Sequence, residues 1–159
     1  MDKFDRNKRS WVMGRVKSKD TKPEVLVRSI LHRLGFRFRK NRTDLPGRPD
    51  IVLPKHHKVI LVHGCFWHGH RKCKRAIRPS SNKAFWERKL NTNMTRDRRN
   101  IRLLKQGGWH VLVIWTCQLG CITTIACRLE DFLSNSAEGV SVHGRRKKDQ
   151  CSQSHSTVS

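Results

Sequence analysis

Three histidines and two cysteines gather within residues 62–73, VHGCFWHGHRKC. Thiolate and imidazole together are the ligands that tetrahedral Zn²⁺ prefers, and Cys65, His70 and Cys73 form the nearest set. A fourth ligand has to come from elsewhere: Cys117 directly follows an apolar run and is the first choice, and the alternatives are Cys121, His68 and His63. Without a metal, these would be unrelated buried thiols and surface histidines, which loops rarely gather at this density.

Two aspartates stand where a plain structural role is harder to assign. Asp50 opens a predicted strand, where propensity disfavours aspartate, so it is either a turn cap or a functional carboxylate. Asp97 lies three and four residues from Met94 and Ile101, on the apolar stripe of a predicted helix, without a basic neighbour at helical spacing. Such a carboxylate needs a distant partner. We expect a histidine from residues 63–68, made more basic by Asp97; the alternative is a buried loop cap.

Glu24 and the aromatic residues admit two interpretations. Glu24 fits a capping box with Thr21, which explains it without any function. Phe66 and Trp67 are consecutive in a predicted loop, so at least one is expected to be exposed, where it can stack on bases or insert between them. A second aromatic pair, at residues 85–86, is explained at least as well by core packing.

Aspartate and histidine, without a serine or cysteine triad, favour metal-assisted hydrolysis of a phosphodiester. Mg²⁺ prefers oxygen ligands and would take Asp50 together with phosphate and water. A histidine would act as the general base. The Cys/His set would hold a different, structural ion.

The composition indicates the class of partner. Lys and Arg number 35 against 12 acids in 159 residues, a formal net charge of +23, which points to nucleic acid. Apolar residues make up 36%, which argues against a wholly disordered basic protein. No apolar run is long enough to span a bilayer, and the start, MDKFDRNKRS, lacks a signal-peptide apolar region. We therefore expect reduced thiols in a cytoplasmic, nucleoid-associated protein.

Hydrophobic spacing predicts a single α/β domain with a central mixed β-sheet flanked by helices. Helices are expected at residues 21–34, 81–106 and 122–133, with glycine after the first two. Strands are expected at residues 36–39, 50–53, 58–62 and 109–115, the last of them buried and central. The predicted order is therefore α-β-β-β-α-β-α.

The ends of the chain are predicted to differ from this domain. Residues 1–20 form a basic N-terminal segment, expected to contact DNA, in which Trp11, Val12 and Val16 suit one side of a short helix. The compact domain spans residues 21–133. From residue 134 the chain is rich in Ser, Gly, Lys and Arg, and we expect a disordered basic tail over 134–159.

Four motifs in order carry a family resemblance: LPGRPDIVL, VHGCFWHGH, FWERKLNTNMTRDRRN and GWHVLVIWTC. Over residues 7–133 the chain resembles the very short patch repair (Vsr) DNA mismatch endonucleases of the PD-(D/E)xK nuclease superfamily. The resemblance implies a restriction-endonuclease-like fold and a structural Zn²⁺. It also implies Mg²⁺-dependent nicking of double-stranded DNA next to the thymine of a T·G mismatch, by a monomer.

The resemblance also assigns roles to individual residues. It makes Asp50 the Mg²⁺ ligand, and places the superfamily's second acid at Val62, where only the backbone carbonyl can serve. The other catalytic positions are His68 as the base that activates water, with His63, Asp97 and Glu24. The zinc ligands match Cys65, His70, Cys73 and Cys117, and the residues that wedge into DNA match Phe66, Trp67 and Trp86.

Two other functions remain open. The chain can be a non-catalytic zinc protein that binds distorted duplex, which the intact set of Asp50, His63, His68 and Asp97 disfavours. It can also be a related nicking endonuclease with a different target, because mismatch specificity is not visible in a motif.

Overall fold

The computed structural model describes residues 19–135, so the predicted N-terminal helix and the basic tail lie outside the described residues. The elements, in chain order, are α2 (Lys22–Arg33), β1 (Ile51–Leu53), β2 (Lys58–His63), α3 (Lys83–Gln106), β3 (His110–Trp115) and α4 (Ile122–Ser134). Short 3₁₀ turns follow β1, the loop after β2, and β3, at Pro54–His56, Lys74–Ala76 and Thr116–Gly120. In the described part of the chain, no helix is long and apolar enough to cross a membrane.

The strands form a mixed sheet in the order β1-β2-β3. β1 and β2 are an antiparallel hairpin in which Ile51 lies opposite Ile60, and β2 pairs with β3 in parallel. The predicted α/β class with a mixed sheet is confirmed. The prediction that β3 is buried and central was wrong, because β2 is the strand with a partner on both sides and Ile114 is the one fully buried residue of β3. The apolar run of β3 reflects helices packed on the sheet, which periodicity cannot distinguish from a central position.

The predicted strand at residues 36–39 is reduced to an isolated bridge between Arg39 and Val52. The predicted alternation holds, because Phe36 and Phe38 both pack against the hydrophobic core. The extended stretch is brief because Asn41 adopts a positive φ of 50°, which turns the chain away from the sheet.

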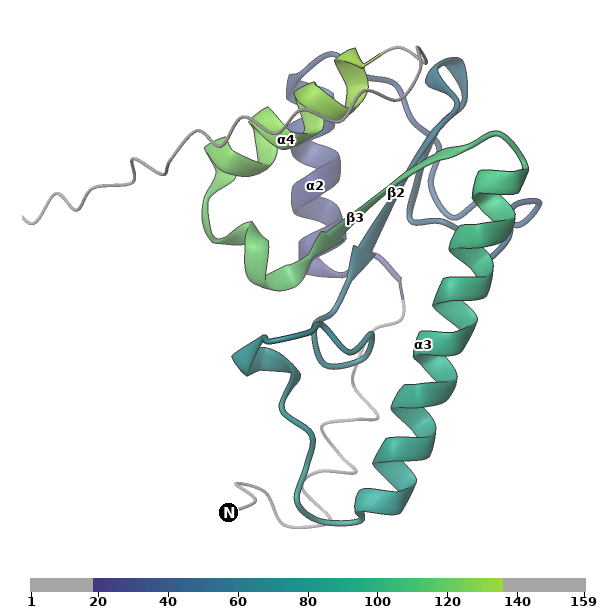
Figure 1. The fold of residues 1–159 in the computed structure, drawn as a ribbon. Helices are drawn as coiled ribbons and strands as arrows, with labels where there is room; N and C mark the ends of the chain where they lie inside the picture. Colours follow the sequence, from purple (N-terminus) through teal and green to yellow (C-terminus); the bar gives the residue numbers. More distant parts are fainter. Residues whose placement is uncertain (1–18, 136–159) are drawn as a thin grey trace, which may run out of the picture.

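Helices cover both faces of the sheet (Figure 1). On one face, α2 and α4 pack on Ile51, Ile60 and Ile114, and the packing residues of the two helices include Val27, Leu31, Ile125 and Leu129. On the other face, Leu104 of α3 packs on side chains of β1 and β2, which are Val52, Val59 and Leu61. Successive residues of β2 therefore enter opposite cores, as the two-residue period of a strand requires.

A buried lysine connects the start of β2 to the end of α4. Lys58 is 4% exposed, and its ammonium group donates to the carbonyl oxygens of Leu133 at 2.9 Å and Asn135 at 2.8 Å. The last carbonyls of a helix have no partner within the helix, so a lysine at this position stabilises the helix end.

We predict that Lys58→Met lowers the free energy of unfolding by about 2 kcal/mol, because the α4 carbonyls lose charged hydrogen bonds. Urea unfolding followed by circular dichroism measures the change. Lys55→Met, at an exposed lysine of the β1–β2 connection, is the matched control. Equal stability of the two variants would show that the lysine bonds contribute nothing net.

Candidate active site

A cavity of about 900 Å³ lies at the carboxyl end of β2, between α2, the loop after β2 and α3. Its lining brings together every side chain predicted to be catalytic: Glu24, Asp50, His63, His68 and Asp97. These residues come from four separate parts of the chain. The sheet and α3 position them, because β2 ends at His63 and Asp97 lies in the middle of α3.

Asp50 immediately precedes β1 and is held by the neighbouring strand. The backbone N–H of Val62 donates to Oδ2 of Asp50 at 2.7 Å. Burial raises the pKa of Asp50 to about 6, and the charge of Glu24 adds to this, although the Val62 N–H opposes it. A buried carboxylate beside a second acid is a position where a cation would be stabilising.

His68 is the distant partner expected for Asp97. Nδ1 of His68 lies 2.5 Å from Oδ2 of Asp97. Burial alone would raise the pKa of Asp97, but the hydrogen bond from His68 and nearby positive charge outweigh it and lower that pKa. Because the aspartate accepts the Nδ1 proton, the opposite ring nitrogen, Nε2, is left as the basic atom.

The ring of His63 stacks on the ring of His68, with centroids 4.0 Å apart and planes 10° apart. His63 is 7% exposed. Burial, and then the neighbouring His68, lower the pKa of His63 to about 4, so this imidazole is neutral at neutral pH. It therefore presents an uncharged polar group beside His68.

Glu24 does not form the predicted capping box. Its Oε1 accepts from the Thr21 hydroxyl at 2.7 Å and its Oε2 from the Asp20 N–H at 3.0 Å, whereas the box requires the Thr21 side chain to bond a backbone N–H. Arg28 is buried beside it, paired with Asp20 at 2.6 Å, and its Nη2 has no hydrogen-bond partner within residues 19–135. Glu24 thus lines the cavity while its carboxylate is held by the two residues that precede α2.

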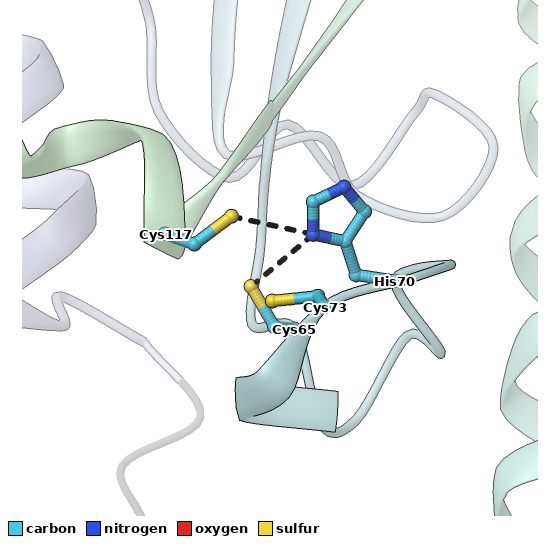
Figure 2. Close-up of side chains that lie close together, drawn as sticks. All are labelled: Cys65, His70, Cys73 and Cys117. Atoms are coloured by element: carbon cyan, nitrogen blue, oxygen red, sulfur yellow. Dashed lines mark hydrogen bonds between the residues drawn. The ribbon is translucent and has the colours of Figure 1, made fainter. Parts of the chain in front are cut away.

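A second cluster, of Cys65, His70, Cys73 and Cys117, lies next to the cavity (Figure 2). Their ligand atoms all lie within 4.8 Å of one another. Nδ1 of His70 is 3.6 Å from the Cys65 sulfur and 3.3 Å from the Cys117 sulfur. Parallel pairing of β2 with β3 explains the meeting, because the chain segments after both strands leave the same end of the sheet.

Three thiols and an imidazole grouped in this way have the ligand chemistry of a metal-cation site. Burial opposes ionisation of Cys65, but hydrogen bonds from the Thr116 hydroxyl and the Cys117 backbone lower the pKa of this thiol to about 6. Burial, and then the sulfurs of Cys65 and Cys73, raise the pKa of Cys117 to about 11. Several thiolates can coexist here only with a positive ion among them.

The competing ligand candidates lie elsewhere. The sulfur of Cys121 contacts the Thr123 hydroxyl at 3.0 Å, at the start of α4, outside the cluster. His63 and His68 form a separate group with Asp97. The structure places Cys117, the first choice because it directly follows a strand, in the cluster with Cys65, His70 and Cys73.

The aromatic residues form one contiguous group beside the cavity. Phe66 and Trp67 are half-buried and lie 5.1 Å apart, and both rings contact Trp86. Trp86 is only 7% exposed, whereas Phe85 is 52% exposed. Of the second aromatic pair, only the tryptophan is a core residue in this conformation.

Sequence reasoning missed Asn93 and Thr116. Asn93 is buried, lines the cavity, and donates from Nδ2 to the Trp67 carbonyl at 3.3 Å. It precedes Asp97 by four residues, so helical spacing could have placed both on one face. The Thr116 hydroxyl lies 3.4 Å from the Cys65 sulfur, a contact across the sheet that no local pattern reveals.

Comparison with known proteins identifies the family. A family model described as DNA mismatch endonuclease Vsr matches residues 1–75. The chain is 44% identical over 135 residues to the type II nicking enzyme V.XorIIP of Xanthomonas oryzae pv. oryzae, covering 85% of this chain and 98% of the relative. The chain belongs to the Vsr family. As a Vsr protein it is an endonuclease that acts on DNA.

Two further relatives align with this chain over most of their own lengths. The type II nicking enzyme V.NmeAIP of Neisseria meningitidis serogroup A is 48% identical over 118 residues, or 74% of this chain and 84% of the relative. The DNA mismatch endonuclease Vsr of Escherichia coli K12 is 41% identical over 118 residues, or 74% of this chain and 75% of the relative. The Vsr assignment therefore rests on most of the chain and includes the cavity and the Cys/His cluster.

We predict that Asp50→Asn makes this Vsr protein more stable at pH 8. The pKa of Asp50 is raised in the folded state, to about 6, so its stabilising contribution is present at low pH and is lost as pH rises through 6. The amide carries no charge and can still accept from the Val62 N–H. The gain should grow from about pH 4 to just above pH 6, stay constant up to pH 8, and reach on the order of 2 kcal/mol.

Urea unfolding in magnesium-free buffer at several pH values measures this difference. Asp131→Asn, at an exposed aspartate of α4, is the control and should show no pH-dependent change. A stability difference between Asp50→Asn and wild type that stays constant with pH would mean that Asp50 is not destabilised by burial.

Proposed function

We propose that this Vsr endonuclease cuts one strand of duplex DNA next to the thymine of a T·G mismatch, in a Mg²⁺-dependent reaction. The observation that carries the proposal is the cavity that holds Asp50 together with the His68–Asp97 pair. An acid that can bind a hard cation and a histidine that can act as a base are the two requirements of metal-assisted phosphodiester hydrolysis.

Asp50 is the residue that would hold Mg²⁺, with the Val62 carbonyl at the position of the second acid in the PD-(D/E)xK pattern. The fit rests on the chemistry of the donors: one oxygen of the buried Asp50 carboxylate accepts from Val62, and Glu24 lies within electrostatic reach. When bound, Mg²⁺ would stabilise the negative charge that develops on the phosphate. Glu24 adds negative charge that favours the cation.

His68 is the proposed general base. Asp97 fixes the ring through Nδ1, and Nε2 is therefore free to accept a proton from the attacking water. The same carboxylate stabilises the imidazolium that forms, as an aspartate does in other Asp–His pairs. His63 packs against the ring and limits its rotation.

Zn²⁺ is the proposed occupant of the Cys65–His70–Cys73–Cys117 cluster. Tetrahedral zinc with Zn–S near 2.3 Å and Zn–N near 2.0 Å places sulfur and nitrogen about 3.6 Å apart. The two sulfur–nitrogen distances of 3.6 and 3.3 Å suit that geometry. Bound there, zinc would join the loop after β2 to the end of β3.

Phe66, Trp67 and Trp86 are the proposed wedge. Their rings already pack edge-to-face or tilted against one another beside the cavity, so insertion between base pairs would exchange these contacts for contacts with bases. Unstacking a step costs a few kcal/mol, and stacking an aromatic ring on a base returns about 1–3 kcal/mol. A T·G wobble pair is less well stacked than a matched pair, which tips this balance toward the mismatch.

The basic segments at the two ends, residues 1–20 and 134–159, are proposed to add DNA contacts to an endonuclease domain of residues 21–133 that acts as a monomer in the nucleoid. One alternative target is supported by a specific observation. Several relatives are named as type II nicking enzymes, which is compatible with a related nicking endonuclease that has a different target.

Nicking of labelled T·G and T·A duplexes, with and without Mg²⁺, tests the proposal. Wild type should cut the T·G duplex only with Mg²⁺. Asp50→Ala should abolish cutting while leaving DNA binding largely intact, because binding rests on Lys and Arg. Asp97→Asn should slow cutting by roughly 10²–10⁴-fold. Asp131→Asn is the matched control on α4.

The double variant Phe66→Ala/Trp67→Ala tests the wedge in the same assay. It should lose the preference for T·G over T·A more than it loses affinity for DNA. Circular dichroism and metal content check that it remains folded. Equal cutting of both duplexes by wild type would refute mismatch specificity, and full preference in the folded double variant would refute the wedge.

We predict one zinc ion per chain. Cys117→Ser should lose the metal and unfold at lower temperature, because structural zinc binding is coupled to folding. Cys121→Ser, four residues further along and outside the cluster, should keep it. Elemental analysis of protein purified without chelators gives the stoichiometry. Zinc retained by Cys117→Ser but absent from Cys121→Ser would mean that the fourth ligand is misassigned.

A further inference from the structure

Three exposed cations lie in the turn of the Cys/His cluster. Arg71 and Lys72 stand between His70 and Cys73, and Lys74 follows directly. Among the described residues, these three side chains make no hydrogen bond or ion pair. We refer to Arg71, Lys72 and Lys74 as the basic turn. Neither catalysis nor the metal cluster requires their charge.

The basic turn is anchored on both sides. His70, which precedes the basic turn, and Cys73, which lies within it, both belong to the cluster. After it, Arg75 donates from Nη1 to the Thr116 carbonyl at 3.3 Å. Arg78 then bonds the first turns of α3, donating to Glu87 Oε1 at 3.3 Å and Asn91 Oδ1 at 3.2 Å. Two cations of this loop are thus used as anchors, and within residues 19–135 the three of the basic turn have no such partner.

The anchors place the basic turn just outside the cavity. Thr116 and Trp67 line the cavity, and Thr116 also receives Arg75 of the loop. No residue of the basic turn is among those that line the cavity. DNA that occupies the cavity and continues past Trp67 and Thr116 would therefore bring its backbone phosphates to these cations.

We propose that the basic turn is a phosphate clamp, which binds the duplex outside the cavity on the side of the Cys/His cluster. Duplex DNA carries one negative charge per about 1.7 Å of axis, so three adjacent cations can each meet a phosphate. The cluster fixes the turn before DNA arrives, which reduces the ordering cost of the contacts. The clamp rests on the proposed function only in placing the duplex in the cavity.

The salt dependence of binding measures the clamp. The triple variant Arg71→Gln/Lys72→Gln/Lys74→Gln should reduce the slope of log K against log[salt] by about 2–3, since each phosphate contact contributes about 0.9. The matched control is Arg98→Gln/Arg102→Gln/Lys105→Gln. It removes three exposed charges of α3 that line a separate shallow groove. The control should change the slope by less than about 1.

Binding is measured on a matched duplex and on a T·G duplex. The clamp predicts the same slope change on both, so a failure of mismatch specificity would leave the clamp standing. Metal content and circular dichroism verify the fold. An unchanged slope in the folded basic-turn variant, or equal changes in both triple variants, would overturn the clamp.

A second measurement uses the wild-type protein, so it does not depend on the folding of any variant. Uncharged methylphosphonates replace three phosphates on one arm of the duplex and then on the other. Neutralising one arm should reduce the slope by about 2–3 through loss of the clamp contacts, and the basic-turn variant should be insensitive to that same arm. If neutral phosphates at every position change the salt slope of the wild type and of the basic-turn variant by the same amount, the basic turn does not contact DNA.

Discussion

Parallel pairing of β2 with β3 is the constraint on which both sites depend. It brings His63 and Trp115 to the same end of the sheet, so the segments that follow these residues must meet. One of these segments carries Cys65 and His68 and the other carries Cys117. Antiparallel pairing of β1 with β2 then brings Asp50 to the same end. With any other register, the carboxylate, the histidine pair and the thiols would be separated.

Electrostatics set the division of labour between the two sites. The cavity gathers carboxylate oxygens, which suit a hard cation, while the neighbouring cluster gathers thiols, which suit a softer one. Both groups draw on residues 63–70, but they have no member in common. His63 and His68 belong to the cavity, whereas Cys65 and His70 belong to the cluster. Two elements keep them apart. On α3, Asp97 contacts His68, and in the 3₁₀ turn after β3, Cys117 contacts His70 and Thr116 contacts Cys65.

Local sequence was sufficient for most of the elements and for the pairing of His68 with Asp97. The helices, the hairpin and the pairing of Asp97 with a histidine of the loop followed from spacing, because a carboxylate on an apolar stripe demands a partner. Three features did not follow: the edge position of β3, the loss of a strand at residues 36–39, and the use of both Glu24 oxygens. Each depends on which strand or side chain arrives from a distant part of the chain, and no local period encodes that.

Two glycines show how closely the loops of the cavity approach α3. A Cβ on Gly69 would lie 2.5 Å from the Met94 sulfur, and one on Gly47 would lie 2.6 Å from the Asn100 amide nitrogen. Gly69 and Gly47 also have positive φ angles, 62° and 75°, which disfavour any residue with a side chain. The backbone conformation and the lack of space therefore both favour glycine at these two positions. α3 therefore acts as a template against which two loops are pressed. Tolerance to substitution should consequently be uneven around this one helix, low where it faces glycine and high along its charged outer side. Variation among proteins built on this plan can accumulate on that outer side without disturbing the spacing of the side chains that line the cavity.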